Sequence, residues 1–266
     1  MQGRVLIIAG SDSGGGAGIQ ADIKTVTMLG GYAATALTAL TAQNTKGVAG
    51  IEAVPAAFVR QQMEAVLSDI GADALKTGML HTTDIVETVA DVLAERAAGL
   101  PLVVDPVAVA KGGARLLDAK AMAALKERLL PLASVATPNL PEAEALAGRP
   151  IAADGLEAAA QALLALGPRA VLLKGGHLEG NEVRDVLATP EGIETFTSPR
   201  IETRHTHGTG CTLASAIATG LAQGLDLRAA VCRARAYVAE AIRTAPGFGE
   251  GHGPLNHGHP LKGGAA

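Results

Sequence analysis

The chain has 266 residues, of which 48% are hydrophobic and 18% charged, and its formal net charge is −4. This composition supplies a large buried core and excludes global disorder. Because basic clusters are absent and aromatic residues make up only 2%, we expect no nucleic-acid partner. No apolar run reaches the length of a membrane span, and residues 5–9 are too few for a signal peptide core, so we expect a cytoplasmic protein without a membrane partner.

Short apolar runs alternate with helical patterns along the sequence. In chain order, they predict strands at residues 5–9, 32–42, 48–54, 74–76, 102–104, 134–136 and 170–173. Between them, helices are predicted at residues 17–29, 55–70, 84–98, 118–130, 141–147 and 155–166. Residues 184–187 and 193–196 predict a hairpin that turns at 189–192, and helices at 209–223 and 226–244 follow.

This alternation predicts an α/β fold with a mainly parallel sheet and helices on both faces. No linker or repeat interrupts the pattern, so residues 1–266 are expected to form a single domain. Asp105, Asn139 and Lys174 follow three of the predicted strands. In open α/β sheets ligands bind beyond the carboxyl ends of the strands, so we expect these side chains to line one crevice.

The segment His207-Gly208-Thr209-Gly210-Cys211 leads directly into a predicted helix. The two glycines let backbone N–H groups converge, and the helix N-terminus adds a partial positive charge, so the segment suits an anion. Cys211 lies about 200° around the helix from the predicted core stripe. It is either a small buried filler or, as its place in the first turn favours, a reactive thiol with a lowered pKa.

Four polar residues near the predicted crevice each have two interpretations. Asn139 and Glu142 are three positions apart at a strand-to-helix junction, where they can serve Mg²⁺ or simply cap the helix. Asp105 precedes a proline and can be a metal ligand or a turn-forming residue. Lys174, followed by two glycines, can reach a phosphate or stand solvated before a turn.

The glycine-rich loop at residues 14–18 matches neither a dinucleotide fingerprint nor a Walker-type phosphate loop. We interpret it as a flexible segment, with Asp12 and Asp22 available to bind something small and polar. His205 and His207 have a spacing that could suit a metal, but without further ligands nearby we expect local hydrogen bonding instead.

Seven segments, taken together and in this order, resemble those of the ribokinase-like kinases. The resemblance is stronger to the bacterial hydroxymethylpyrimidine/phosphomethylpyrimidine kinases of thiamin biosynthesis, and it covers almost the whole chain. The segments are residues 8–12 with 14–25, then 41–45, 76–80, 105–107, 137–144, 174–177 and 206–212.

The resemblance implies a ribokinase-like three-layer α/β/α fold. It also implies an enzyme that uses ATP and Mg²⁺ and forms a homodimer. It implies phosphorylation of 4-amino-5-hydroxymethyl-2-methylpyrimidine and then of its monophosphate, which gives the pyrophosphate. At matching positions, it places Asp22 and Gln43 on the polar atoms of the pyrimidine, and Gly10 and Met79 against the ring.

For phosphoryl transfer, the resemblance implies further roles. Cys211 stands where related sugar kinases have an aspartate base, and Lys174 would meet the transferred phosphate. The anion hole would consist of Gly208, Thr209 and Gly210, and magnesium would be organised by Asp105, Asn139 and Glu142.

Two departures from the family pattern bear on selectivity. Ser13 replaces the usual proline and is expected to loosen the loop over the pyrimidine, and Ala108 replaces a methionine and would widen a neighbouring wall. The main alternative is a kinase of vitamin B6 alcohols, and a non-catalytic pyrimidine sensor is an alternative of another class. Candidate lids are Lys111-Gly112-Gly113 and Gly14-Gly15-Gly16.

Overall fold

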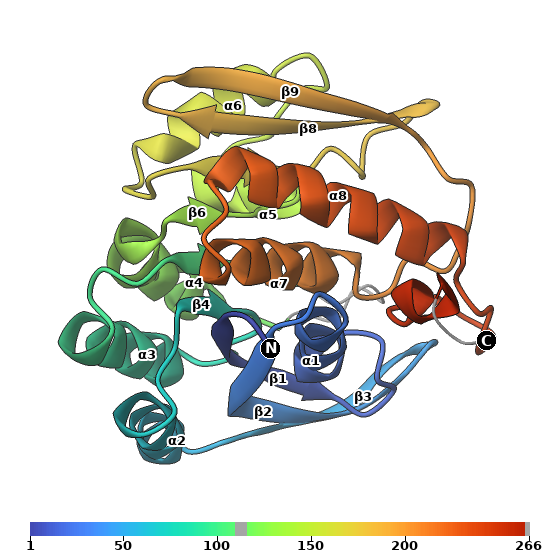
Figure 1. The fold of residues 1–266 in the computed structure, drawn as a ribbon. Coiled ribbons are helices and arrows are strands. Elements are labelled where there is room, and N and C mark those ends of the chain that lie inside the picture. Colours follow the sequence, from blue (N-terminus) through green and yellow to red (C-terminus); the bar gives the residue numbers. More distant parts are fainter. Residues whose placement is uncertain (110–115, 264–266) are drawn as a thin grey trace.

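In the computed structural model, which describes residues 1–109 and 116–263, one nine-stranded sheet runs through the molecule in the order β3-β2-β1-β4-β5-β6-β7-β8-β9 (Figure 1). The pairs from β2 through β1, β4, β5 and β6 to β7 are parallel, whereas β3, β8 and β9 join antiparallel. The strands are β1 (Arg4–Asp12), β2 (Tyr32–Asn44), β3 (Gly47–Ala53), β4 (Ala74–Thr77), β5 (Leu102–Val104), β6 (Val135–Ala136), β7 (Val171–Leu173), β8 (Glu182–Thr189) and β9 (Gly192–Pro199).

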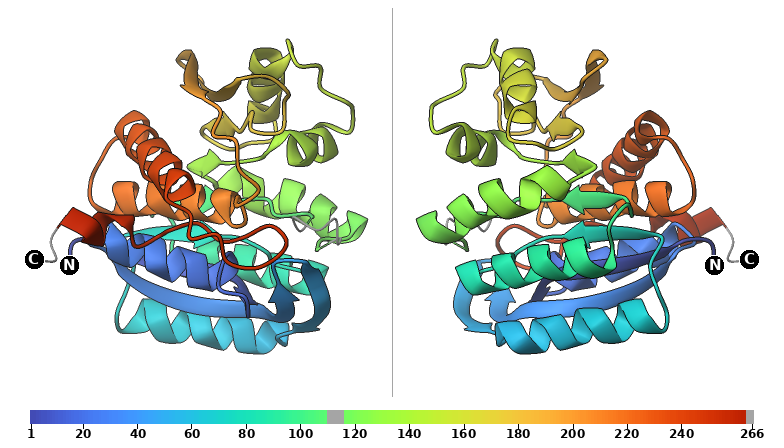
Figure 2. Two further views of the ribbon diagram at one scale, coloured as in Figure 1. Left: turned by 90° about the vertical axis from the view of Figure 1, so that its right-hand side faces the viewer. Right: turned by 90° about the vertical axis from the view of Figure 1, so that its left-hand side faces the viewer.

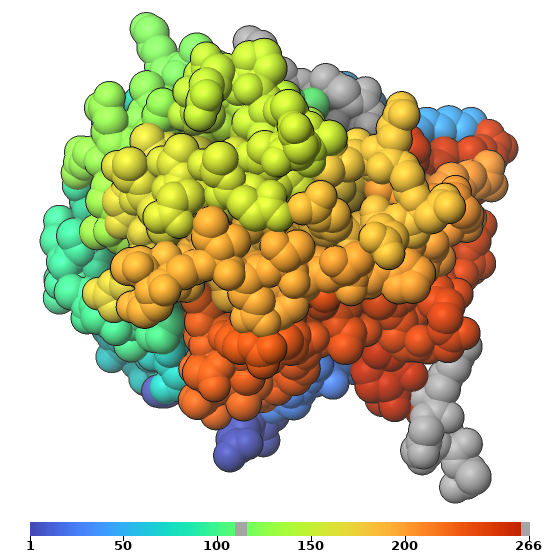
Figure 3. Space-filling model, turned by 90° about the horizontal axis from the view of Figure 1, so that it is seen from above, coloured from blue at the N-terminus to red at the C-terminus, as the bar shows by residue number. Residues whose placement is uncertain are grey.

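Helices cover both faces of the sheet and make three layers, as predicted (Figure 2). The helices are α1 (Gly18–Met28), α2 (Ala56–Ser68), α3 (Thr83–Arg96), α4 (Ala119–Ala124), α5 (Leu140–Ala147), α6 (Leu156–Leu164), α7 (Thr209–Ala222) and α8 (Leu227–Arg243). Alternate residues of β1 enter opposite cores: Leu6 and Ile8 pack with α2 to α6, while Val5 and Ile7 pack with α1, α7 and α8. Seen from above, α6 and the β8–β9 hairpin form much of the surface (Figure 3).

Several predicted elements differ in length from those observed, and for two of them the structure shows the reason. β1 continues three residues beyond the predicted end at Ala9, because Ser11 and Asp12 still pair with β2. The helix predicted at residues 118–130 begins as expected, with the Asp118 side chain accepting from Ala121 N at 2.8 Å. It then becomes π-helical at Leu125–Leu129 and ends in a 3₁₀ turn that contains Pro131, which has no N–H to donate.

The chain after α8 returns to the β1 side of the molecule (Figure 2). Its backbone binds two distant segments: His207 N donates to Gly253 O at 3.1 Å, and His252 N donates to Thr45 O at 2.9 Å. None of the helices in residues 1–109 and 116–263 combines the length and the apolar character needed to cross a membrane.

Candidate active site

The carboxyl ends of β5, β6 and β7 bring three of the predicted site residues together. Lys174 Nζ lies 2.9 Å from Asp105 Oδ1, and the backbones of Lys174 and Asn139 form a parallel bridge. Thr137 Oγ1 donates to the same Asp105 oxygen at 3.0 Å. The part of the sequence prediction that brings these three strand-end residues together therefore agrees with their positions.

Asn139 and Glu142 form a capping box at the start of α5. Asn139 Oδ1 accepts from Glu142 N at 2.9 Å, and Glu142 Oε2 accepts from Asn139 N at 2.8 Å. The capping interpretation is thus confirmed. Glu142 also lies close to the other charged residues, since its Oε2 is 4.0 Å from Lys174 Nζ.

Burial raises the pKa of the Glu142 carboxyl to about 7, with Asp105 acting in the same direction and Lys174 opposing it. Carboxylate oxygens are hard donors, and a divalent cation between two of them favours their ionised form. The side chains of Asp105 and Glu142 therefore fit Mg²⁺. Within the described part of the chain, no group of three or more His, Cys, Asp or Glu side chains could hold a metal on its own.

The first turn of α7 lies directly against this charged group. A Cβ on Gly210 would stand 3.1 Å from Lys174 Nζ and 3.6 Å from Asp105 Oδ2. Gly208, at the N-cap, has a φ of +83°, and a Cβ there would stand 1.8 Å from Gly16 O. Among the described residues no side chain caps this helix; the Thr209 N–H donates to Thr206 O at 3.4 Å, and the N–H groups that follow it in the first turn suit an anionic ligand. The Thr209 hydroxyl, by contrast, donates to Thr206 O at 2.7 Å.

Cys211 is partly exposed and stands one helical turn before Ser215 on α7. The prediction of a lowered thiol pKa is wrong for this structure. Burial raises the pKa of Cys211 to about 12; Asp22 and Asp105 act in the same direction, and Lys76 opposes them. The charge of Lys76 does not offset the desolvation of the thiolate.

Asp22 and Lys76 form an ion pair that is completely buried. Lys76 Nζ donates to Asp22 Oδ2 at 2.8 Å, and Ser215 Oγ donates to Asp22 Oδ1 at 2.6 Å. The neighbouring carboxylates outweigh desolvation and raise the pKa of Lys76, which keeps it charged. The interpretation of Asp22 as a freely available carboxylate is therefore corrected, because both its oxygens already accept hydrogen bonds.

Asp12 likewise organises the glycine-rich loop instead of standing free. Its carboxylate accepts from the N–H groups of Gly14, Gly16 and Ala17 at 2.8 to 3.1 Å. His207 Nε2 lies 2.8 Å from Asp12 Oδ2, so the expectation of local hydrogen bonding is confirmed for this histidine. Although burial acts to raise it, the hydrogen bonds from His207 and Ala17 lower the pKa of Asp12.

The remaining predicted substrate residues lie around this loop. Gly10 contacts Met79 so closely that a Cβ on the glycine would stand 2.4 Å from Met79 Cε, and Met79 packs with Ala39 and Leu116. Gln43 Nε2 lies 3.3 Å from His207 Nε2. The expectation that Ser13 loosens the loop is not met, because its hydroxyl makes two hydrogen bonds with the Gln43 backbone.

The other departure from the family pattern, Ala108, and one of the two candidate lids lie within the described residues. Ala108 is nearly buried, and its backbone is hydrogen-bonded to the Glu142 carboxylate. Lys111-Gly112-Gly113 lies outside the described residues. The other candidate lid, at residues 14–16, is the loop that Asp12 holds.

Sequence reasoning missed the residues that hold the segment after Lys174. The Arg200 guanidinium donates to three backbone oxygens of this segment: Gly180 O at 2.6 Å, Gly176 O at 3.1 Å, and Leu178 O. The bonds span 20 to 24 positions, and no motif signals them. Arg200 thus fixes the shape of the connection between β7 and β8.

A second arginine holds the position next to Lys174. Gly175 N donates to Asp185 Oδ1 at 3.1 Å, and Asp185 Oδ2 accepts from Arg235 Nε at 2.8 Å. A Cβ on Gly175 would stand 1.8 Å from Arg184 O, so only glycine fits there.

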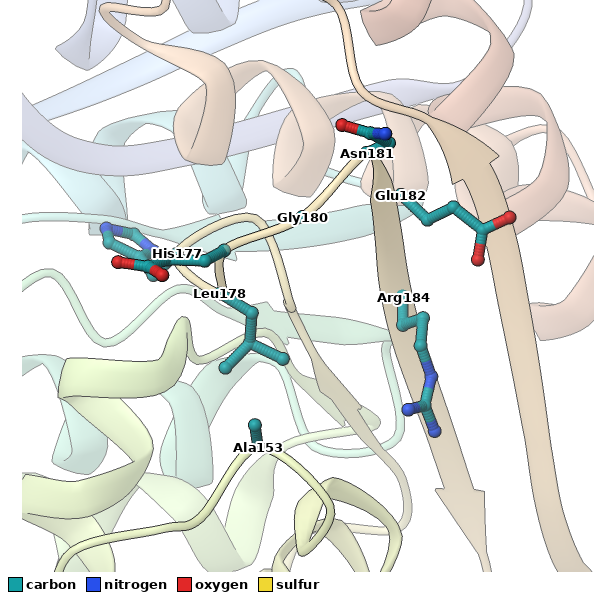
Figure 4. A pocket seen from close by; sticks show the side chains of 8 residues that line it. Ala153, His177, Leu178, Gly180, Asn181, Glu182 and Arg184 are labelled. Atoms are coloured by element: carbon teal, nitrogen blue, oxygen red, sulfur yellow. The ribbon is translucent and has the colours of Figure 1, made fainter.

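A cavity of about 600 Å³ adjoins this connection (Figure 4). It lies between the α5–α6 loop and the start of β8, and none of the predicted site residues lines it. Its lining consists of Ala153, His177, Leu178, Glu179, Gly180, Asn181, Glu182 and Arg184.

Comparison with known proteins bears directly on this geometry. The model of the family described as phosphomethylpyrimidine kinase matches residues 12–256. The chain belongs to this family. Among curated members, a hydroxymethylpyrimidine/phosphomethylpyrimidine kinase of Streptomyces coelicolor is 51% identical over 97% of this chain and 95% of its own length.

The chain is also similar to part of a longer protein, the thiamine biosynthesis bifunctional protein ThiED of Geobacter sulfurreducens. The two are 56% identical over 96% of this chain, which spans about half (52%) of that relative.

Solved structures of two kinds share the fold. A phosphomethylpyrimidine kinase from Clostridium difficile has a TM-score of 0.79 and 40% identity over 90% of this chain and 99% of its own. A Bacillus subtilis pyridoxal kinase in complex with ADP has a TM-score of 0.88 and 36% identity, over 97% of this chain and 98% of its own. These matches confirm the ribokinase-like fold that the motifs predicted.

Proposed function

We propose that the chain is an ATP-dependent kinase that phosphorylates 4-amino-5-hydroxymethyl-2-methylpyrimidine and then its monophosphate, for thiamin biosynthesis. The observation that carries the proposal is the meeting of Lys174 and Asp105 with the uncapped first turn of α7. Such a site combines a cation, a carboxylate and the N–H groups of a helix N-terminus, as phosphoryl transfer requires. Relatives that are named for this activity and that match nearly end to end support the choice of substrate.

On the nucleotide side, the backbone of Gly208, Thr209 and Gly210 and the ammonium of Lys174 would stabilise the charge on the transferred phosphoryl group. Asp105 and Glu142, with Asn139, would hold Mg²⁺, and the bound ion supplies further neutralisation of phosphate charge. The Lys174–Asp105 pair holds the ammonium beside the helix N-terminus, 3.1 Å from where a Gly210 Cβ would stand.

On the acceptor side, Gly10 and Met79 would form the wall against the pyrimidine ring, and Gln43 would donate or accept at its edge. Asp22 would act mainly through its buried pair with Lys76. Cys211, in the first turn of α7, would face the hydroxymethyl group. Because its pKa in this structure is about 12, it would act as a hydrogen-bond partner while protonated, and as the base only once ATP and Mg²⁺ lower that pKa.

The decisive test is a turnover assay with ATP, MgCl₂ and the hydroxymethylpyrimidine. We expect ADP release that requires all three and that falls at least about a hundredfold in Lys174→Ala, because a stabilising charge is lost. No ADP release with any hydroxymethyl heterocycle would overturn the kinase proposal. Binding of the pyrimidine without turnover would instead favour a non-catalytic pyrimidine sensor.

The role of Cys211 is tested by measuring the two phosphorylations separately. The first acceptor is an alcohol that must lose a proton, whereas the second is a phosphate monoester that is already mostly ionised near neutral pH. We expect Cys211→Ala to reduce the first step more than the second. Equal losses in both steps would contradict the role as base.

A pyridoxal kinase activity is the second candidate. It is favoured by TM-scores of 0.88 to 0.89 to pyridoxal kinases of Bacillus subtilis and Staphylococcus aureus, over 97% of this chain. Their 35 to 36% identity is lower than the 46 to 56% of the curated pyrimidine-kinase relatives, and for this reason we rank it second. Comparing kcat/KM for the hydroxymethylpyrimidine and for pyridoxine separates the two.

We also propose, from the family resemblance, that the enzyme works in the cytoplasm as a homodimer. Light scattering on the purified protein tests the second point, with a mass of about twice the 26.7 kDa of one chain as the expected result.

A further inference from the structure

We propose that Ser13 is a positioning residue of the pyrimidine site, whose hydroxyl ties the glycine-rich loop to Gln43. The inference rests on the proposed function, because Gln43 is one of the residues expected to contact the pyrimidine. It goes beyond that function in assigning a role to a position that departs from the family pattern.

The bonds that carry this inference are reciprocal. Ser13 Oγ donates to Gln43 O at 2.8 Å, and the same oxygen accepts from Gln43 N, also at 2.8 Å. The parallel pairing of β1 with β2 ends just before this point, at Asp12 and Thr41. One side chain therefore satisfies both backbone groups of Gln43 where the strand ladder stops.

The loop that Ser13 anchors is held at its other side by Asp12. The Asp12 carboxylate binds three N–H groups of the loop and lies 2.8 Å from His207 Nε2. Beyond His207, the N-cap Gly208 contacts the loop so closely that a Cβ would stand 1.8 Å from Gly16 O. The loop thus lies between Gln43 and the first turn of α7.

Asp12 and Ser13 consequently act on different sides of the site. Asp12 is buried and joins the loop to the segment before α7, whereas Ser13 is exposed and its two side-chain hydrogen bonds both go to Gln43. Without the Ser13 hydroxyl, the Gln43 backbone loses two partners, while the Asp12 contacts remain. The expected result is a less ordered Gln43, and a smaller fraction of molecules ready to bind the pyrimidine.

The experiment compares Ser13→Ala with Ser13→Thr, which keeps the hydroxyl, and with Ser68→Ala. Ser68 is a matched control, because its exposed hydroxyl donates to Ala65 O on α2. For Ser13→Ala we expect KM for the hydroxymethylpyrimidine to rise about three- to tenfold, with kcat and the KM for ATP within about twofold. Ser13→Thr should restore KM to within about twofold, and Ser68→Ala should not change it.

Amide hydrogen exchange supplies a readout that does not depend on activity. We expect the peptide that contains Gln43 to exchange faster in Ser13→Ala, and the thermal midpoint to change little. Unchanged exchange and unchanged KM in Ser13→Ala would overturn the proposal, as would equal changes in the KM values for the two substrates. If the wild-type protein shows no turnover, the proposed function fails, and the exchange comparison still decides whether Ser13 orders Gln43.

Discussion

Burial decides which side chains of this site can ionise. Cys211 stands beside a helix N-terminus and near a charged lysine, yet its pKa is raised to about 12, because the thiolate would be desolvated between two carboxylates. Lys76 remains charged in the same surroundings, since Asp22 lies 2.8 Å from its ammonium. A thiol that stays neutral near pH 7 is a poor nucleophile toward small alkylating agents.

We therefore predict that Cys211 resists alkylation. In a Cys232→Ser background, which leaves Cys211 as the one thiol of the sequence, iodoacetamide at pH 8 should react at least about a hundredfold more slowly than with glutathione. Mass spectrometry follows the modification. Reaction at the rate of an ordinary thiol would show that the carboxylates and burial do not control this cysteine.

Single residues also show where sequence reasoning ended. The sequence located Asp105, Asn139, Lys174 and the first turn of α7, because strand ends and helix starts are local signals. It misjudged Cys211 and Ser13, whose behaviour depends on partners far along the chain. Gln43, for example, stands 30 positions from Ser13, and no spacing rule predicts that contact.

At the scale of elements, the N-terminus of α7 has two glycines with different roles. Gly208 has a left-handed backbone and contacts Gly16 O, so we expect Gly208→Ala to lower the free energy of unfolding by more than about 2 kcal/mol. Gly210 lies within the helix, where alanine is favoured by about 1 kcal/mol. A Cβ added at Gly210 would, however, stand only 3.1 Å from Lys174 Nζ, so the ammonium would have to move.

Gly210→Ala should thus keep or gain stability and still lose about tenfold or more in kcat. Urea unfolding and steady-state kinetics of the two variants check the pair. Parallel losses of stability and activity in both variants would contradict the separation of roles.

The Arg200 guanidinium makes three of the hydrogen bonds that hold the β7–β8 connection. Because lysine cannot donate to three separate carbonyls in the fork geometry of Arg200, we expect Arg200→Lys to raise the KM for ATP about fivefold or more, with less change in kcat. Arg243→Ala is the control, since that exposed arginine pairs only with Glu240 among the ion pairs of the described residues. An unchanged KM for ATP would show that Arg200 does not position Lys174 for ATP binding.

At the scale of the molecule, most of the fold followed from hydrophobic pattern. Buried runs such as Leu102–Val104 gave the strands, and the hairpin at Thr189 and Gly192 was placed correctly. Pattern did not reveal how the segment after α8 returns to the site. That segment has few apolar residues, and it is held by polar contacts such as the 2.9 Å bond between His257 Nε2 and Thr212 Oγ1.

This return predicts sensitivity to acid. Burial lowers the pKa of His257 to about 4, so the unfolded chain takes up a proton as the pH falls below about 6.5 while the folded protein does not. Stability present above pH 6.5 is therefore lost progressively toward pH 4. Between pH 7 and 5 the loss is on the order of 2 kcal/mol.

Urea unfolding at pH 7 and pH 5 measures this loss, and His257→Gln should reduce the difference between the two. The pKa of His259 is also lowered, so the variant should still lose some stability between pH 7 and pH 5, but less than the wild type. The same pH dependence in His257→Gln and wild type would assign the effect to other groups.

The contacts around the glycine-rich loop also have a consequence for the order of folding. Asp12 meets His207 from 195 positions away, and Thr45 meets Gly251 from 206 positions away. Closing chain segments of this length is slow and comes late, because the entropy is lost before the contacts form. A chain still emerging from the ribosome can build β1, α1 and β2 early, but it cannot complete the loop until residues beyond 250 have been synthesised. The capacity to bind both ligands is therefore acquired at the end of folding, after the sheet has formed.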